Sequence, residues 1–154
     1  MNAVRVERHL EPEPIPDECI LEFDGDLTDW LVSTGAARRY SAWACFHTTM
    51  YSFDVDGMTC GIVPRTIGGP YAVLVAEQMA VSGARLVLGL TSAARVSSSM
   101  PVPGLAVATR AIRDEGTSYH YLPAAATIDA PPKVVNLLES ELRTTSLPFL
   151  SGTV

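Results

Sequence analysis

A Gly-rich turn between two short apolar runs gives the clearest hydrophobic pattern along the chain. Residues 60–63 and 85–90 are apolar runs with the length and composition of buried strands. Gly68-Gly69 predicts a turn after the first run, and the apolar spacing that follows predicts a helix over residues 70–82, opened by a proline and ended by a glycine. Strand, turn, helix and strand within about thirty residues form a βαβ unit, whose strands run parallel.

The remaining apolar and β-branched runs predict further strands and helices on both sides of this unit. Asp56-Gly57 lies between two such runs and is the strongest short-range signal for a hairpin. The expected strands cover residues 19–23, 49–55, 58–63, 105–112 and 147–154, and the expected further helices cover residues 27–34 and 133–143. This order predicts an α/β fold with a mostly parallel, twisted sheet flanked by helices. Because no helix follows the last strand to cover the sheet, we expect a fold that is truncated at its C-terminus.

The chain is expected to consist of an arm and one domain. Residues 1–18 carry prolines at the alternate positions 12, 14 and 16, which favours an extended backbone. This Pro-rich arm is either a loose terminus or a segment that reaches onto a neighbouring subunit. Residues 19–154 have the length and hydrophobic content of a single α/β domain.

Composition and charge narrow the range of partners. The net charge is −6 and the chain has no run of Lys or Arg, so we expect no nucleic-acid partner. No apolar run approaches the ~20 residues of a membrane span, so we expect no membrane partner. Cys19, Cys45 and Cys60 share no metal-ligand spacing, and free thiols favour a cytoplasmic location. Asp24 and Asp26 flank a glycine without a third ligand nearby, which favours a turn over a metal site.

The chemistry is expected at the carboxyl ends of the parallel strands, where ligands of such sheets gather. Residues 64–69 and 91–95 follow the two strands of the βαβ unit. Backbone N–H groups at the start of the helix favour an anion, and Arg65 or Arg95 could add a guanidinium there. Either arginine could equally be a surface charge.

Three motifs resemble the nucleoside phosphorylases of the uridine and purine type. Residues 67–70, Ile-Gly-Gly-Pro, and the Ala-Glu-Gln of residues 76–78 are similar to the family's Gly-Ile-Gly-Gly-Pro-Ser turn and its Glu-Glu-Leu helix. Residues 115–120, Glu-Gly-Thr-Ser-Tyr-His, resemble its Asp-Gly-Ala-Ser-x-His segment. Residues 24–26, Asp-Gly-Asp, resemble its Pro-Gly-Asp turn. The resemblance covers the N-terminal part of that family.

The resemblance implies an activity and its participants. Members of the family cleave or form the N-glycosidic bonds of nucleosides, so a nucleoside or base is the implied ligand, with phosphate as candidate co-substrate and no other cofactor. The family's base and ribose contacts lie in a C-terminal half that this sequence does not include. The implied assembly is therefore a homo-oligomer, or a complex with a partner chain that supplies that half. The alternative is a non-catalytic remnant, or a regulatory or interaction subunit, with the same fold.

Two departures concern the arginines that bind phosphate in the family. The strand after the family's helix ends Arg-Ile-Gly-Thr, where this chain has Gly-Leu-Thr-Ser at residues 89–92, so a hydroxyl remains and the guanidinium is absent. A second family arginine, shortly after the Gly-Asp turn, is replaced by Asp29. No catalytic residue and no metal ligand are assigned. The candidates for binding the anion or substrate are Gly25, Arg65, Gly68, Gly69, Thr91 and Ser92, with Arg95 and His120 as additional candidates.

Overall fold

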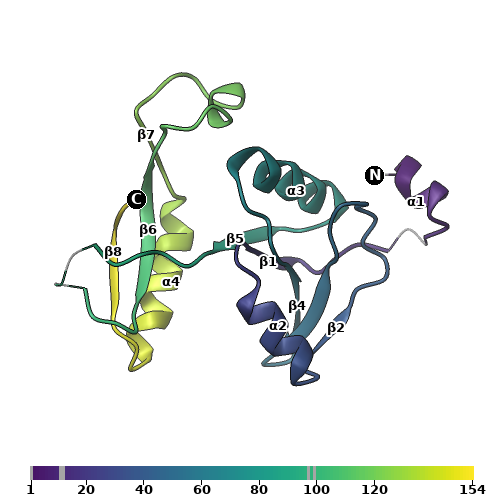
Figure 1. The fold of residues 1–154 in the computed structure, drawn as a ribbon, viewed down its shortest axis with the longest axis horizontal. Helices are drawn as coiled ribbons and strands as arrows, with labels where there is room; N and C mark the ends of the chain where they lie inside the picture. The colour runs from purple at the N-terminus through teal and green to yellow at the C-terminus, as the bar shows by residue number, and fades with distance from the viewer. Residues whose placement is uncertain (1, 11–12, 97, 99) are drawn as a thin grey trace. The chain divides into compact units, whose positions relative to one another are not determined.

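The chain divides into two compact units, residues 1–93 and 94–154, called here the first and second unit (Figure 1). The computed structural model describes residues 2–10, 13–96, 98 and 100–154. A single domain was expected over residues 19–154. The structure differs because the strands on either side of the boundary belong to separate sheets, so that each unit builds a sheet of its own.

The first unit is built on a five-stranded sheet in the order β2-β3-β4-β1-β5. Strand β1 lies between β4 and β5 and runs parallel to both, whereas β3 is antiparallel to its neighbours β2 and β4. The elements of this unit are α1 (Asn2–Glu7), β1 (Glu18–Glu22), α2 (Asp26–Ser33), β2 (Ala37–Arg39), β3 (Tyr51–Val55), β4 (Met58–Val63), α3 (Gly69–Ser82) and β5 (Leu86–Leu90).

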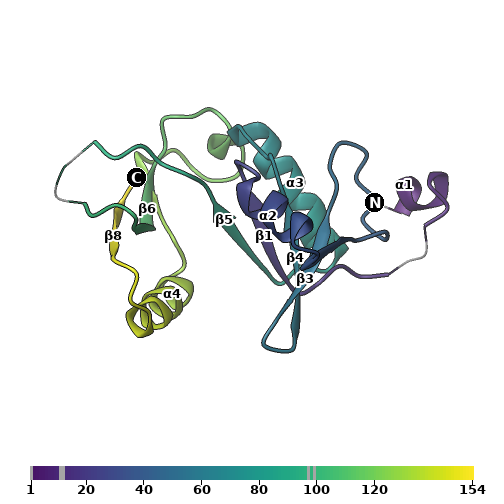
Figure 2. The same ribbon diagram turned by 60° about the horizontal axis from the view of Figure 1, so that its bottom comes forward.

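The hairpin and the βαβ unit predicted from the sequence are both present. Strands β3 and β4 are joined by a tight turn (Figure 2), and Val55 is paired with Met58 across it. Asp56 and Gly57 both have positive φ, at 49° and 80°, as a two-residue hairpin turn requires. The strands that α3 connects are parallel, as predicted, but they are not neighbours, because β1 is inserted between them. Strand β2, only three residues long, was not predicted.

Helices cover both faces of the first unit's sheet, with α2 and α3 on opposite sides (Figure 1). Successive residues of a strand point to opposite faces, and the core residues of β4 follow this rule. Val63 packs in the cluster that contains Val75 and Met79 of α3, whereas Ile62 packs in the cluster that contains Leu31 of α2. The sheet is therefore buried on both sides along its parallel strands, as a parallel sheet requires.

The N-terminal arm is docked onto the first unit. Ile15 is only 3% exposed and belongs to the core cluster beneath α3. Its N–H donates to the Ser82 carbonyl at 3.1 Å, and the Tyr40 hydroxyl donates to the Pro14 carbonyl at 2.7 Å. Residues 13–17 are therefore neither a loose terminus nor free to reach a neighbouring subunit. Helix α1 also departs from the extended backbone expected for this arm, and Pro12 lies outside the described residues.

The second unit is a three-stranded sheet with one helix along it (Figure 1). The central strand β6 runs parallel to β8 and antiparallel to β7. Strand β7 was not predicted from the sequence. Val107 is the one buried apolar side chain among the described residues of this unit, so its core is thin. The elements are β6 (Leu105–Ile112), a 3₁₀ turn (Ser118–His120), β7 (Thr127–Asp129), α4 (Pro132–Thr144) and β8 (Phe149–Thr153).

Within the described part of the chain, no helix combines the length and the apolar character needed to cross a membrane.

Replacing Ile15 tests whether the arm is part of the core. We expect Ile15→Ala to lower the free energy of unfolding of the first unit by about 2–5 kcal/mol, because it removes buried methyl groups and leaves a cavity. Urea unfolding followed by tryptophan fluorescence measures the change, because both tryptophans lie in the first unit and Trp43 belongs to the same cluster as Ile15. Val6→Ala is the matched control, because Val6 lies in the same arm but is 75% exposed. Equal effects of the two substitutions would contradict the docked arm.

Candidate functional site

The carboxyl ends of β1, β4 and β5 meet at one edge of the first unit's sheet, called here the carboxyl edge. Leu21 is paired with both Val63 and Gly89, so the three strands end level with one another. Beyond the strands, the Phe23 N–H donates to the Leu90 carbonyl at 2.9 Å. The segments that follow the three strands therefore begin side by side. Those segments carry the sequence candidates Gly25, Arg65, Gly68, Gly69, Thr91 and Ser92.

The Arg65 side chain lies directly over Gly25. A Cβ atom at Gly25 would stand 3.0 Å from both Cγ and Cζ of Arg65, a tighter contact than most Cβ atoms make, so the Arg65 side chain would have to shift. Gly25 also has φ 111°, which L side chains rarely adopt, so the position requires glycine for two reasons. Arg65 itself has φ 60°, uncommon for a residue with a side chain. The structure thus brings together two candidates that are 40 positions apart in the sequence.

Asp29 holds the free end of the Arg65 side chain. The Nη2 atom of Arg65 lies 2.5 Å from Oδ2 of Asp29, which stands one helical turn into α2. Both side chains are more than half exposed, so water and salt screen the pair and its contribution to stability is small. Asp29 occupies the position at which the resemblance leads one to expect an arginine. Arg65 supplies a guanidinium from a different strand end, and Asp29 neutralises it.

A buried carboxylate caps the N-terminus of α2. Glu22 is 3% exposed, and its side-chain oxygens accept hydrogen bonds from the Leu27 N–H at 2.8 Å and the Thr28 N–H at 3.1 Å. The Thr28 hydroxyl donates a third at 2.5 Å. Two of the amides that could attract an anion at this helix start, those of Leu27 and Thr28, are therefore already occupied. Sequence reasoning missed Glu22; the available signal was an acidic residue that ends an apolar strand a few residues before a helix.

A second carboxylate joins the ends of β1 and β5. Oδ2 of Asp24 accepts a hydrogen bond from the Ser92 N–H at 2.5 Å. The Thr91 hydroxyl donates to the Ser92 carbonyl at 3.2 Å, and both residues are exposed. The turn expected at Asp24 is present, and it also fixes the segment after β5. Thr91 and Ser92 thus lie at the carboxyl edge, as the sequence predicted, with their hydroxyl groups at the surface.

Gly68 and Gly69 lie at the start of α3, which begins at Gly69, one residue before the predicted start at Pro70. Gly68 precedes the helix with φ 99°, and no side chain hydrogen-bonds to the cap within the described residues. A Cβ atom at Gly68 would meet no atom within 4 Å, so the glycine serves the backbone conformation and not a close contact. Gly89, where the family resemblance leads one to expect arginine, is different. A Cβ atom there would stand 3.4 Å from the Phe23 ring.

Arg95 and His120 belong to the second unit and are not positioned relative to the carboxyl edge. The Arg95 guanidinium donates to the Met100 carbonyl at 3.1 Å. His120 is exposed at the end of the 3₁₀ turn, in a loop that the buried guanidinium of Arg113 anchors. Arg113 donates to the Ser118 hydroxyl at 2.8 Å and to the Pro123 carbonyl at 2.7 Å.

The carboxylate of Glu115 orders the same loop. It accepts hydrogen bonds from the Thr117 N–H at 2.7 Å and the Ser118 N–H at 3.0 Å. Hydrogen bonds from Ser118 and Thr117 lower the pKa of the Glu115 carboxyl below its ordinary value. The family-like segment of residues 115–120 is therefore held by its own side chains.

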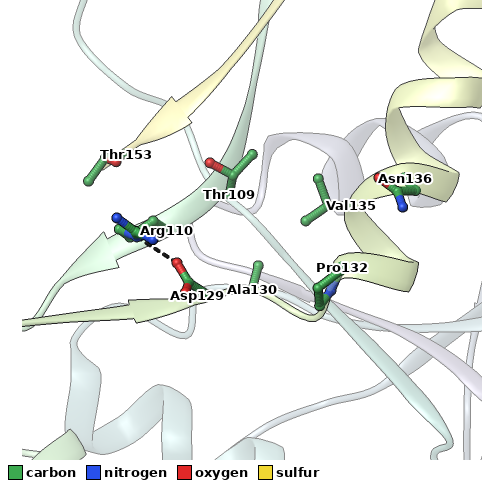
Figure 3. Close-up of a pocket in the computed structure, with 8 residues that line it drawn as sticks. All are labelled: Thr109, Arg110, Asp129, Ala130, Pro132, Val135, Asn136 and Thr153. Carbon is green, nitrogen blue, oxygen red and sulfur yellow. Dashed lines mark hydrogen bonds and ion pairs between the residues drawn. The ribbon is translucent and has the colours of Figure 1, made fainter.

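An open hollow of about 420 Å³ lies between α4 and the strands of the second unit (Figure 3). The Nε atom of Arg110 lies 2.5 Å from Oδ1 of Asp129 there, and this hydrogen bond lowers the pKa of Asp129 and raises that of Arg110. No residue that the sequence predicted for a site lines the hollow. Its lining consists of Thr109, Arg110, Asp129, Ala130, Pro132, Val135, Asn136 and Thr153.

A double-mutant cycle tests the packing of Arg65 over Gly25. We expect Gly25→Ala to lower the free energy of unfolding by about 1–3 kcal/mol, from backbone strain and from the collision with Arg65. In an Arg65→Ala background the collision is absent, so the same change should cost about 1 kcal/mol less. Urea unfolding measures all four proteins.

Gly35→Ala is the control for this cycle. Gly35 has φ 75° but nothing within 4 Å of a Cβ atom, so its effect should add to that of Arg65→Ala without coupling. A Gly25→Ala cost that is equal in both backgrounds would contradict the close packing.

The comparisons with known proteins agree with this architecture. The model of the phosphorylase superfamily matches residues 23–154. No curated protein matches the sequence. A uridine phosphorylase from Vibrio fischeri ES114 superposes with a TM-score of 0.75 at 22% identity, over 96% of this chain and 59% of that one. A purine nucleoside phosphorylase from Toxoplasma gondii, solved with immucillin-H, superposes with a TM-score of 0.79 at 16% identity, over 94% of this chain and 58% of that one.

These findings confirm the α/β fold class and the family expected from the motifs. The chain spans just under three fifths of the length of these solved relatives. At such identities the superpositions establish the fold, and the match of the superfamily model establishes the family. The chain belongs to the phosphorylase superfamily.

Proposed function

We propose that this chain provides one side of a site that cleaves or forms the N-glycosidic bond of a nucleoside, at the carboxyl edge of the first unit. The observation that carries the proposal is the convergence there of Arg65, Gly25 and the Thr91-Ser92 segment, in a chain of the phosphorylase superfamily. The solved relatives are named as uridine and purine nucleoside phosphorylases. The three cysteines are free thiols, which supports a cytoplasmic location.

The chemistry of such a site is positioning and electrostatic stabilisation. Breaking the bond between sugar and base develops positive charge on the sugar, and a nucleophile, phosphate or water, attacks the same carbon. Thr91, Ser92 and Arg65 would hold the nucleophile, because their polar groups lie exposed where β4 and β5 end. Base and ribose contacts would come from the remainder of a phosphorylase fold, supplied by another chain. Without them, positioning of the substrate is incomplete and turnover is slow.

A nucleoside panel tests this function. The purified 154-residue chain is incubated with uridine, adenosine and inosine, with and without phosphate, and free base is measured by chromatography. We expect slow release, well below about 1 per second, because only one side of the site is present. Arg65→Ala should abolish the release.

Arg85→Ala is the matched control for the panel. Arg85 is also exposed and paired to an aspartate, Asp17, but it lies just before the opposite end of β5. Release that is unaffected by Arg65→Ala, or absent above the buffer blank, would contradict the enzymatic proposal. Release at 1 per second or faster by the wild-type chain, on the order of an ordinary enzyme, would contradict the incomplete site.

The second candidate is a non-catalytic regulatory or interaction subunit with the same fold. The thin core of the second unit favours it, because apolar side chains there remain at the surface. Ile112 is 57% exposed and Leu150 is 47% exposed. Exposed apolar side chains on a small sheet are typical of a surface that a partner covers. This candidate and the enzymatic one both require association with another chain.

Light scattering tests the association. We expect a mass of at least twice the 16.5 kDa of one chain, because the sheet of the second unit exposes apolar side chains and a strand edge. Leu150→Glu on β8 should shift the protein toward the monomer. Val55→Glu is the control, since Val55 is similarly exposed, at 44%, in the hairpin of the first unit. A wild-type mass near 16.5 kDa at micromolar concentration would contradict self-association.

A further inference from the structure

Three carboxylates of this chain already occupy donor groups at the carboxyl edge that could otherwise attract an anion. Glu22 accepts from two amides in the first turn of α2, Asp24 accepts from the Ser92 amide, and Asp29 is paired with the Arg65 guanidinium. Each donor group comes from a different segment: a helix start, a strand end and a loop. A phosphate that bound to any of these three donors would therefore have to displace a carboxylate.

The charge at this edge also opposes phosphate. Residues 22–29 contain four acidic side chains and no basic one, and Arg65 is the basic residue that packs against them. Like charges a few ångströms apart repel each other, most strongly where one carries two charges, as phosphate does near neutral pH. The carboxyl edge therefore resembles the family in backbone geometry, while its local charge has the opposite sign from that of an anion site.

Asp29 differs from the other two carboxylates because its partner is the guanidinium, the strongest phosphate ligand at this edge. The Asp29 carboxylate is exposed, and the pair sits at the surface over Gly25. Glu22, by contrast, is buried against α2 and serves the fold. Removing the charge of Asp29 would leave Arg65 unpaired in the same position, with Gly25 still giving it room.

We propose that Asp29 is a specificity-determining residue that keeps inorganic phosphate off Arg65, so that water is the nucleophile of this site. The inference rests on the proposed function. In the hydrolysis, the water oxygen forms a bond to C1′ of the sugar while the bond from C1′ to the base nitrogen breaks. The electron pair of that bond stays on the base nitrogen, which takes one proton of the water. The products are the free base and the free sugar.

Phosphate titration calorimetry tests the inference without any need for turnover. Inorganic phosphate is titrated into the wild-type chain, Asp29→Asn, Asp26→Asn and the double variant Asp29→Asn/Arg65→Ala. Asp26→Asn is the matched control, because it removes an equal charge from the first turn of the same helix, and Asp26 makes no ion pair among the described residues. Circular dichroism confirms that each variant is folded, and Asp29→Ala replaces Asp29→Asn if the latter is not.

We expect Asp29→Asn to bind phosphate about tenfold more tightly than the wild-type chain, because it frees the guanidinium and removes a nearby like charge. Asp26→Asn should change the affinity by about threefold at most, since it only reduces the surrounding charge. The gain in phosphate affinity should disappear in the double variant Asp29→Asn/Arg65→Ala, because the gain depends on the Arg65 guanidinium.

Three results would overturn the inference. The first is an equal gain in phosphate affinity in Asp26→Asn and Asp29→Asn. The second is a wild-type phosphate affinity as high as that of Asp29→Asn, and the third is an Asp29→Asn variant that does not bind phosphate. Base release by the wild-type chain that requires phosphate would overturn it as well. If no base is released under any condition, the proposed function fails, while the titration still decides whether Asp29 controls phosphate binding.

Discussion

The buried carboxylate of Glu22 joins the parts of the first unit that form the carboxyl edge. Its side chain holds the start of α2, while its backbone carbonyl accepts both the amide and the hydroxyl of Thr66, at 3.2 and 3.1 Å. Thr66 follows Arg65, so this contact also positions the loop that carries the guanidinium. A buried charge is costly unless it is fully hydrogen-bonded, and Glu22 meets that condition with amide and hydroxyl donors. The start of α2 and the loop that carries Arg65 are therefore held by the same residue.

This chain keeps the family's backbone but redistributes its charges. Parallel strands, a positive-φ glycine before α2 and a glycine start to α3 form the backbone of the carboxyl edge in this member of the phosphorylase superfamily. A guanidinium is present, but it comes from the loop after β4, and it faces an aspartate on α2. Fold and chemistry are therefore separable here, because the backbone is set by hydrogen bonds and packing, whereas the charge at the edge depends on a few exposed side chains.

Local signals in the sequence predicted the elements well, and long-range contacts could not be read from it. Asp56-Gly57 fixed the hairpin because both residues tolerate positive φ, and the glycines around α3 marked its ends. Nothing in the local pattern indicated that β1 would lie between the strands of the βαβ unit, or that the second sheet would be separate. The pairing of Asp29 with Arg65 spans 36 positions and could not be inferred from spacing.

The central place of β1 in its sheet has a consequence for how the chain folds. Cys19 pairs with Gly61 on one side and with Val87 on the other, so its strand neighbours are synthesised long after it. Contacts between residues so far apart form slowly, because a long loop must close before they stabilise anything. During synthesis one edge of β1 therefore stays unpaired until β4 has been added, and the other edge stays unpaired until β5 has been added. A nascent chain of this kind is exposed to aggregation, and it is a natural substrate for chaperones that bind apolar segments.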